Sequence, residues 1–143
     1  MAKGKPLYVQ RVDTRVVERV LAYAHRIAVV GASPEPWRPS HTIARFLMAS
    51  GFEVIPVNPT IDRVLGVPTY PSVQAIPHEV DVVDVFRRPE YLEDVARDAA
   101  AAGAKALWLQ SGLRSPSARL IAEAAGMDFV EDHCMKVEIL RRA

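Results

Sequence analysis

The chain has 143 residues, enough to bury one substantial hydrophobic core, and 50% of them are hydrophobic, which excludes a disordered chain. Its formal net charge of +1 argues against a general nucleic-acid binder. We therefore expect a single domain spanning residues 1–143, in which residues 1–26 form an N-terminal helical segment packed on a sheet.

The chain has one cysteine, Cys134, which cannot form an internal disulfide. The N-terminal residues lack the apolar core of a signal peptide, and no stretch approaches the roughly 18 apolar residues of a membrane span. We therefore predict a cytoplasmic protein that does not contact membranes. No spacing of Cys and His residues indicates a metal site.

Hydrophobic periodicity and helix-end signals predict the elements of the first half of the chain. These are a helix capped by Asp13 and reaching Ala24, a strand at 27–30, a helix capped by Ser40 and stopped by Gly51, and a strand at 54–57. The loop that follows is predicted to hold a short strand at 67–70 and one helical turn at 72–76.

The second half continues the alternation of strands and helices. We predict strands at 80–86, 106–110 and 129–130, helices at 89–102 and 115–125, and a short closing segment at 135–140. This alternation indicates the α/β class: a Rossmann-like, doubly wound parallel sheet of about five strands, flanked by helices in three α/β/α layers. The expected order of the five strands across the sheet is 3-2-1-4-5.

Residues typical of binding sites follow four of the predicted strands. In a doubly wound sheet, ligands bind beyond the carboxyl ends of the strands, at the switch point beside the first strand. All four groups fall on that rim, so we expect them to converge on one cleft. They are Gly31-Ala32-Ser33, Asn58-Pro59, Arg87-Arg88-Pro89 and Gln110-Ser111-Gly112.

The residues at this rim favour phosphates but not an ordinary NAD site. The Gly-x-Gly-x-x-Gly fingerprint is absent, and Asn58 stands where NAD-binding proteins have an acidic residue. Guanidinium groups match phosphate geometry, so Arg87 and Arg88 suit a ligand with several phosphates, and Arg38 can add a third contact. Two alternatives stay open: Asn58 forms a simple Asn-Pro turn, and the arginine pair is a solvated helix start.

Other catalytic arrangements have less support. Ser33 is not in a Gly-x-Ser-x-Gly elbow, which argues against a hydrolase that pairs it with His41. Cys134 is either a reactive thiol or a small buried apolar residue. Asp81 and Asp84 are three residues apart on a predicted strand and point to opposite faces, so each is expected to have a structural partner.

Five strings, in order along the chain, resemble the small bacterial and archaeal CoA-binding proteins: IAVVGASPEPWRPSH, VIPVNP, VDVVDVFRRPE, ALWLQSGL and EDHCMK. Those proteins are similar to the CoA-binding N-terminal domain of the succinyl-CoA synthetase α subunit. The resemblance covers nearly everything from Ile27 to Lys136. It implies non-covalent binding of coenzyme A or acyl-CoA.

The resemblance also implies where the cofactor lies. By it, Gly31, Ala32 and Ser33 meet the pyrophosphate; Val57, Asn58 and Pro59 border the adenosine; Phe86, Arg87, Arg88 and Pro89 line the next wall; and Gln110, Ser111 and Gly112 follow the pantetheine. Arg38 and Ser40, in the arm and at the helix start after the first turn, complete the set of expected cofactor-binding residues.

No catalytic residue is assigned, and a position near the thiol of CoA is a further alternative for Cys134, which follows His133. The histidine that is phosphorylated in the synthetase lies in a second domain, and none of the four histidines here corresponds to it, so ligase activity is not implied. Two alternatives to simple CoA binding stay open. One is an NAD(P)- or nucleotide-dependent enzyme that uses the same cleft, and the other is a CoA-responsive regulatory or assembly module that pairs with itself or with a CoA enzyme.

Overall fold

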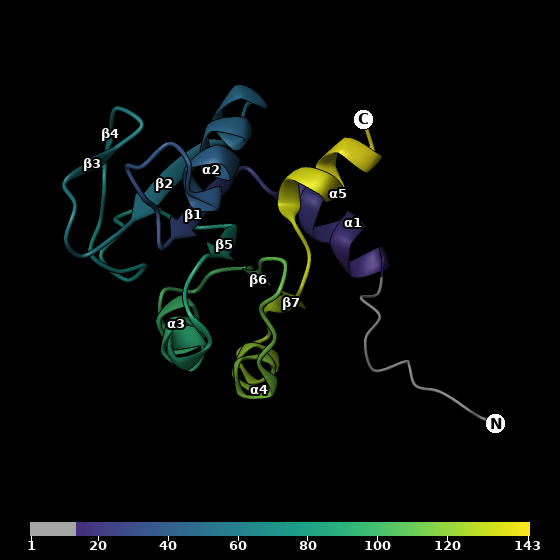
Figure 1. Ribbon diagram of the computed structural model, residues 1–143. Coiled ribbons are helices and arrows are strands. Elements are labelled where there is room, and N and C mark those ends of the chain that lie inside the picture. The colour runs from purple at the N-terminus through teal and green to yellow at the C-terminus, as the bar shows by residue number, and fades with distance from the viewer. Residues whose placement is uncertain (1–13) are drawn as a thin grey trace.

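The computed structural model describes residues 14–143, which form a five-stranded parallel sheet with helices on both faces (Figure 1). The sheet strands are β1 (Arg26–Val30), β2 (Glu53–Val57), β5 (Val82–Val85), β6 (Ala106–Leu109) and β7 (Asp128–Val130), and β3 (Arg63–Val64) and β4 (Val67–Pro68) make a separate hairpin. The helices are α1 (Thr14–Tyr23), α2 (Pro39–Ala49), α3 (Leu92–Ala101), α4 (Pro116–Ala124) and α5 (Met135–Arg141), with a 3₁₀ turn, η3 (Pro89–Tyr91), before α3.

The α/β class and the parallel five-stranded sheet are confirmed, and each predicted sheet strand is present near its expected position. The predicted closing segment at 135–140 is helix α5. Ser115 caps α4 as expected, because its Oγ accepts a hydrogen bond from Ala118 N at 3.1 Å. The expected cap at Asp13 lies outside the described residues.

The prediction that Ser40 caps the second helix is wrong. The helix begins at Pro39, Arg38 occupies the N-cap position, and no side chain accepts a capping hydrogen bond there. Proline has no N–H and a φ already suited to a helix, so it is favoured at the first helical position. Ser40 therefore lies inside the first turn, where it is buried.

The strand order is β2-β1-β5-β6-β7, so the predicted order 3-2-1-4-5 is wrong. The third strand, β5, pairs with β1, with Ile27 opposite Val82. The connection from β2 to β5 packs Val73 and Ile76 on the face opposite α2. Because parallel crossovers are right-handed, a connection that changes face must also reverse its direction across the sheet, which returns the chain to the far side of β1.

The two faces of the sheet have separate cores. Alternate residues of β1 point to opposite faces: Ile27 and Val29 pack with α1, α2 and α5, and Ala28 and Val30 pack with α3 and α4. Figure 1 shows these two helix layers on either side of the sheet. Both faces are covered, so β5 and β6 are buried along their whole length.

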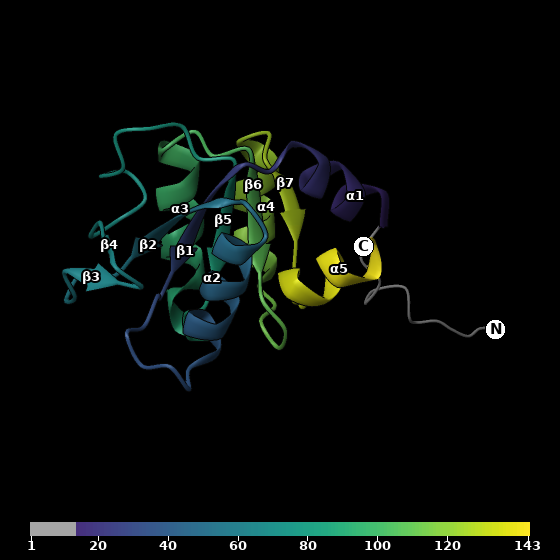
Figure 2. The ribbon, with the colours of Figure 1, turned by 90° about the horizontal axis from the view of Figure 1, so that it is seen from above.

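The carboxyl ends of the strands meet at one edge. Figure 2 shows the arm after β1 and the loop after β6 projecting from this edge, while α1 and α5 lie together beside β7. Within residues 14–143, no helix combines the length and the hydropathy needed to cross a bilayer.

Gly31 joins the ends of three strands. Its φ is +86°, and a Cβ at this position would lie 2.3 Å from the carbonyl oxygen of Phe86, the residue after β5. The backbone N–H groups of Gly31 and Ala32 also donate to the carbonyl oxygen of Val57, at 3.1 and 3.3 Å. Only glycine combines this φ with such a close approach of two backbones.

We expect Gly31→Ala to lose more stability than Gly103→Ala. Gly103 has a similar φ of +73° but open space where a Cβ would lie, so its substitution costs only the left-handed conformation, about 1–2 kcal/mol. At Gly31 the overlap with Phe86 adds about 1–3 kcal/mol. Urea denaturation of the two variants measures the difference. Equal losses would contradict a tight contact between the turn and β5.

Candidate ligand-binding site

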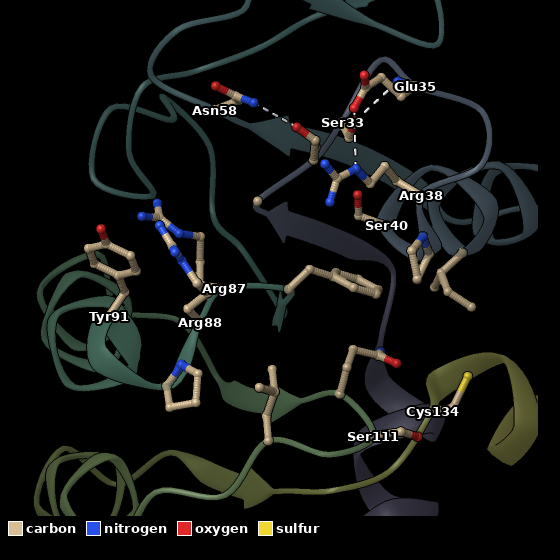
Figure 3. A pocket seen from close by; sticks show the side chains of 18 of the residues that line it. Ser33, Glu35, Arg38, Ser40, Asn58, Arg87, Arg88, Tyr91, Ser111 and Cys134 are labelled. Carbon is tan, nitrogen blue, oxygen red and sulfur yellow. Dashed lines mark hydrogen bonds and ion pairs between the residues drawn. The ribbon is translucent and has the colours of Figure 1, made fainter.

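A pocket of about 890 Å³ lies beyond the carboxyl ends of the strands; we call it the rim pocket. Its walls come from the turns after β1, β2, β5 and β6 and from the first turn of α2 (Figure 3). The structure brings together here all but two of the residues expected from the sequence. Those that line the pocket are Gly31, Ala32, Ser33, Arg38, Ser40, Asn58, Pro59, Phe86, Arg87, Arg88, Pro89, Gln110 and Ser111.

Two expected residues do not line the rim pocket. Val57 lines a smaller neighbouring pocket of about 390 Å³. Gly112 has its N–H bonded to Asp132 Oδ1 at 2.7 Å, and Asp132 also pairs with Arg114 at 2.6 Å. Asp132, in the string EDHCMK, therefore holds the loop after β6 in place through these two interactions.

The sequence did not single out several residues that line the pocket: Glu35, Pro39, Ile43, Thr60, Tyr91 and Leu113. Each lies within a few residues of an expected one, so their closeness in sequence to the strand ends could have predicted that they line the pocket. Cys134 also lines the pocket, with a half-buried free thiol, although it lies far along the chain from the other walls. A position near the CoA thiol was one of the alternatives for Cys134, and the loop after β7 brings it to the rim.

Asn58 fastens two of the turns to each other. Its Nδ2 donates to the carbonyl oxygen of Ala32 at 2.7 Å, and its Oδ1 accepts from Thr60 N at 2.9 Å (Figure 3). A side chain that donates and accepts at once is needed here, and an aspartate cannot donate when it is ionised. Asn58 therefore forms a turn and also uses its amide to hold the pocket floor.

The arm after β1 carries an exposed ion pair that faces the pocket. Ser33 Oγ accepts from Glu35 N at 3.1 Å, and Arg38 Nε lies 3.2 Å from Glu35 Oε1 (Figure 3). The side chains of Arg38 and Glu35 are 61% and 44% exposed, and such pairs contribute little to stability. An anionic ligand can therefore replace Glu35 as the ion-pair partner of Arg38 with little loss of stability.

The two arginines after β5 differ in their surroundings. Arg87 is half-buried, its guanidinium lies 4.1 Å from the centre of the Tyr91 ring, and no carboxylate within residues 14–143 pairs with it. Arg88 is exposed and lies 3.9 Å from Glu90. A guanidinium held on an aromatic face keeps its edge N–H groups available. Arg87 is thus a fixed cation in the pocket wall, whereas Arg88 matches the solvated alternative.

The two aspartates considered as a pair have separate roles. Asp81 accepts from His25 N and Arg26 N at 3.0 and 2.8 Å and pairs with Lys105 at 3.2 Å. Burial raises the pKa of the Asp81 carboxyl, but the bonds from the Arg26 N–H and Lys105 outweigh burial and hold it below its usual value. Its expected structural partners are confirmed.

Asp84 is fully buried on the central strand β5. Its Oδ1 accepts a hydrogen bond from Gln110 Nε2, and its Oδ2 has no partner within residues 14–143. Burial raises the pKa of the Asp84 carboxyl to about 7, and the hydrogen bond from Gln110 opposes this only in part. Gln110 itself lines the rim pocket, so a titrating group lies directly behind the pocket wall.

The structure does not show the Ser33–His41 arrangement considered from the sequence. Ser33 Oγ is bonded to Glu35, and His41 Nδ1 has no partner within residues 14–143. The Nδ1 of His133 lies 2.9 Å from the carbonyl oxygen of Glu131. No group of three or more His, Cys, Asp or Glu side chains in the described part of the chain is arranged to hold a metal ion.

Comparison with known proteins identifies the family. A family model described as a CoA binding domain matches residues 25–139, nearly all of the described chain. The chain belongs to the CoA-binding domain family. The resemblance to the CoA-binding domains of the succinyl-CoA synthetase-like family is therefore confirmed.

Individual relatives differ in how much of their length this CoA-binding domain covers. The Bacillus subtilis (strain 168) protein YneT is 40% identical over 121 residues, which make up 85% of this chain and 90% of YneT. A hypothetical protein from Pyrococcus horikoshii OT3 superposes with a TM-score of 0.87 at 35% identity, covering 99% of this chain and 98% of that one. The ADP-forming acetate–CoA ligase II of Archaeoglobus fulgidus is 35% identical over 89 residues, but this match spans only 13% of the ligase.

We expect Asp84→Asn to raise stability at neutral pH. Asp84 keeps its proton in the folded chain up to about pH 7 but loses it near its ordinary pKa of 3.8 when unfolded. The folded state therefore loses stability as pH rises from about 4 to 7, by a few kcal/mol in all, and asparagine removes that loss. Urea denaturation across this range should show the advantage of the variant growing with pH and then levelling off.

Asp81→Asn is the matched control, with the opposite sign. The pKa of Asp81 is lowered in the folded chain, so its carboxylate stabilises the fold at neutral pH and this contribution is lost on acidification. The asparagine variant should be less stable than the parent at pH 7. A stability difference for Asp84→Asn that does not change with pH would show that the pKa of Asp84 is the same in the folded and the unfolded chain.

Proposed function

We propose that the protein binds coenzyme A or acyl-CoA non-covalently in the rim pocket and catalyses no reaction of its own. Membership of the CoA-binding domain family supports this ligand. The observation that carries the proposal is Arg87, a half-buried guanidinium stacked on Tyr91 and lacking a carboxylate partner within residues 14–143. A partly desolvated cation without a counter-ion favours an anionic ligand beside it.

One end of the rim pocket suits the phosphates of the cofactor. Arg38, Arg87 and Arg88 carry positive charge there, beside the small-residue turn that begins at Gly31. The first turn of α2 also lines the pocket, and the helix dipole places partial positive charge there. Pro39 has no N–H and His41 N and Thr42 N donate to Arg38 O, so the backbone donor that this turn leaves for a ligand is the N–H of Ser40. A diphosphate and a separate 3′-phosphate find several donors within one space.

The other end of the rim pocket suits the pantetheine arm. Several residues that line the pocket carry no positive charge: Ile43, Phe86, Leu113, Ser111 and Cys134. In Figure 3, Ser111 and Cys134 lie across the pocket from Arg87 and Arg88. A ligand with phosphates at one end and a neutral chain ending in a thiol matches this division. A cytoplasmic location, where thiols stay reduced, fits such a ligand.

Calorimetry with CoA, 3′-dephospho-CoA, NAD and ATP tests the proposal. We expect CoA to bind most tightly and the loss of the 3′-phosphate to weaken binding, because fewer charged hydrogen bonds form. Binding of NAD without binding of CoA would overturn the proposal and favour the nucleotide-dependent enzyme. In that case, a turnover screen with NAD(P)H would follow.

We expect Arg87→Ala to weaken CoA binding about tenfold or more, because charged hydrogen bonds contribute about 1.5–3 kcal/mol each. Arg88→Ala should have a smaller effect, since Arg88 is exposed. Both losses should be larger at low salt, because salt screens exposed charges. Calorimetry at two ionic strengths measures them.

Arg97→Ala is the control for a change of net charge. Arg97 lies on α3 outside the rim pocket and pairs with Glu93 at 2.5 Å. Its loss should leave CoA affinity nearly unchanged. Equal CoA affinity of the parent, Arg87→Ala and Arg88→Ala would remove the phosphate-binding role of the arginine pair.

A further inference from the structure

The Asp84–Gln110 pair lies behind the less charged end of the rim pocket. Asp84 is 0% exposed and Gln110 only 5%, yet Gln110 lines the pocket at the carboxyl end of β6. The amide nitrogen of Gln110 donates to Asp84 Oδ1. No residue in the described part of the chain donates a hydrogen bond to the amide oxygen of Gln110, which leaves that atom for a ligand.

The protonation state of Asp84 determines which way the Gln110 amide is best oriented. An ionised carboxylate only accepts hydrogen bonds, so it requires the amide nitrogen and leaves the amide oxygen for the pocket. A protonated carboxyl has an O–H that must donate, and Oδ2 has no acceptor in the described part of the chain. Turning the Gln110 amide by half a rotation supplies an acceptor opposite Oδ1, so the carboxyl donates from a proton held on Oδ1. The amide oxygen then faces Asp84 and the nitrogen faces the pocket.

We propose that Gln110 is a specificity-determining residue whose amide offers the pocket either a hydrogen-bond acceptor or a donor, according to whether Asp84 is ionised or protonated. The identity of the ligand in this inference rests on the proposed function, whereas the coupling between Asp84 and the Gln110 amide does not. An amide oxygen facing the ligand accepts a hydrogen bond, which the thiol of free CoA can donate. An amide nitrogen facing the ligand donates one, which suits the carbonyl oxygen of an acyl thioester.

The environment of Asp84 places its titration in the physiological range. Burial, opposed in part by Gln110, raises the pKa of its carboxyl to about 7. Its neighbours on the adjacent strands are Val29 and Trp108, which carry no charge. The covering elements and the chain beside them contribute titratable side chains that are buried or half-buried, which include Tyr23, His41, Asp128, His133, Cys134, Lys136 and Glu138.

These groups do not account for the raised pKa of Asp84. Tyr23 and Asp128 are bonded to each other at 2.9 Å, and Glu138 pairs with Arg141 and Arg142. None of them contributes to the raised pKa of Asp84, which has burial as its cause. His41, whose Nδ1 is unpartnered within residues 14–143, and the half-buried His133 are the two histidines among them.

The first experiment follows the Gln110 side-chain amide by NMR in the protein without ligand, across about pH 5 to 8. We expect its nitrogen and proton shifts to move with a single titration near pH 7, and to stay constant in Asp84→Asn. Asparagine has both a donor and an acceptor, so it pairs with Gln110 but does not titrate. Gln110 shifts that do not move, or that move equally in Asp84→Asn, would overturn the proposal.

The second experiment compares affinities for CoA and acetyl-CoA by calorimetry at about pH 6 and pH 8. We expect the preference for acetyl-CoA over CoA to be about fivefold greater at the lower pH, which corresponds to one neutral hydrogen bond. The ratio of the two affinities cancels the titration of the phosphates, which both ligands share. The CoA thiol also ionises with pH, and this affects the affinity ratio in every variant. The ratio measured in Asp84→Asn and in Gln110→Leu, which lack the switch, gives the size of that effect.

His41→Gln is a matched control, because His41 is a buried histidine on the helix that covers the same face as Asp84 and does not line the pocket. It should keep the pH-dependent preference. A preference lost in His41→Gln and kept in Asp84→Asn would overturn the assignment to Asp84. If neither CoA nor acetyl-CoA binds, the proposed function fails, and the NMR titration of Gln110 still decides whether the pair behaves as a switch.

Discussion

The close approach of Gly31 to the carbonyl oxygen of Phe86 is the constraint on which the rest of the structure depends. It brings the turn after β1 against the end of β5, and the bonds to Val57 tie the same turn to β2. Three strand ends therefore meet at one point, with the Asn58 amide closing the gap to Ala32. The rim pocket exists because no side chain fills this junction.

The pocket that results is divided by charge. Arg87 and Arg88 lie across the pocket from Ser111 and Cys134 (Figure 3), and apolar side chains such as Phe86 also line it. Behind the pocket wall, the fold keeps a carboxyl group, Asp84, where an apolar residue would avoid the cost of burying a charge. A costly group retained beside a ligand pocket is more readily explained by what it does to Gln110 than by stability.

The sequence by itself determined where the strands and helices lie and which residues stand at the strand ends. Apolar periodicity and the positions of Gly and Pro act over short stretches of chain, so they are visible without the fold. Because the strands are parallel, the residues after each one had to share an edge. This is why nearly all of the expected residues, from Gly31 to Ser111, line the rim pocket.

Only the tertiary structure decided the strand order, because the face on which the chain leaves β2 depends on long-range packing of Val73 and Ile76. The same reason applies at the site. The stacking of Arg87 on Tyr91 and the hydrogen bond between Gln110 and Asp84 join groups whose relative positions follow from packing, not from spacing along the chain. Local sequence fixes which groups are present, whereas burial and neighbours fix their charge and orientation.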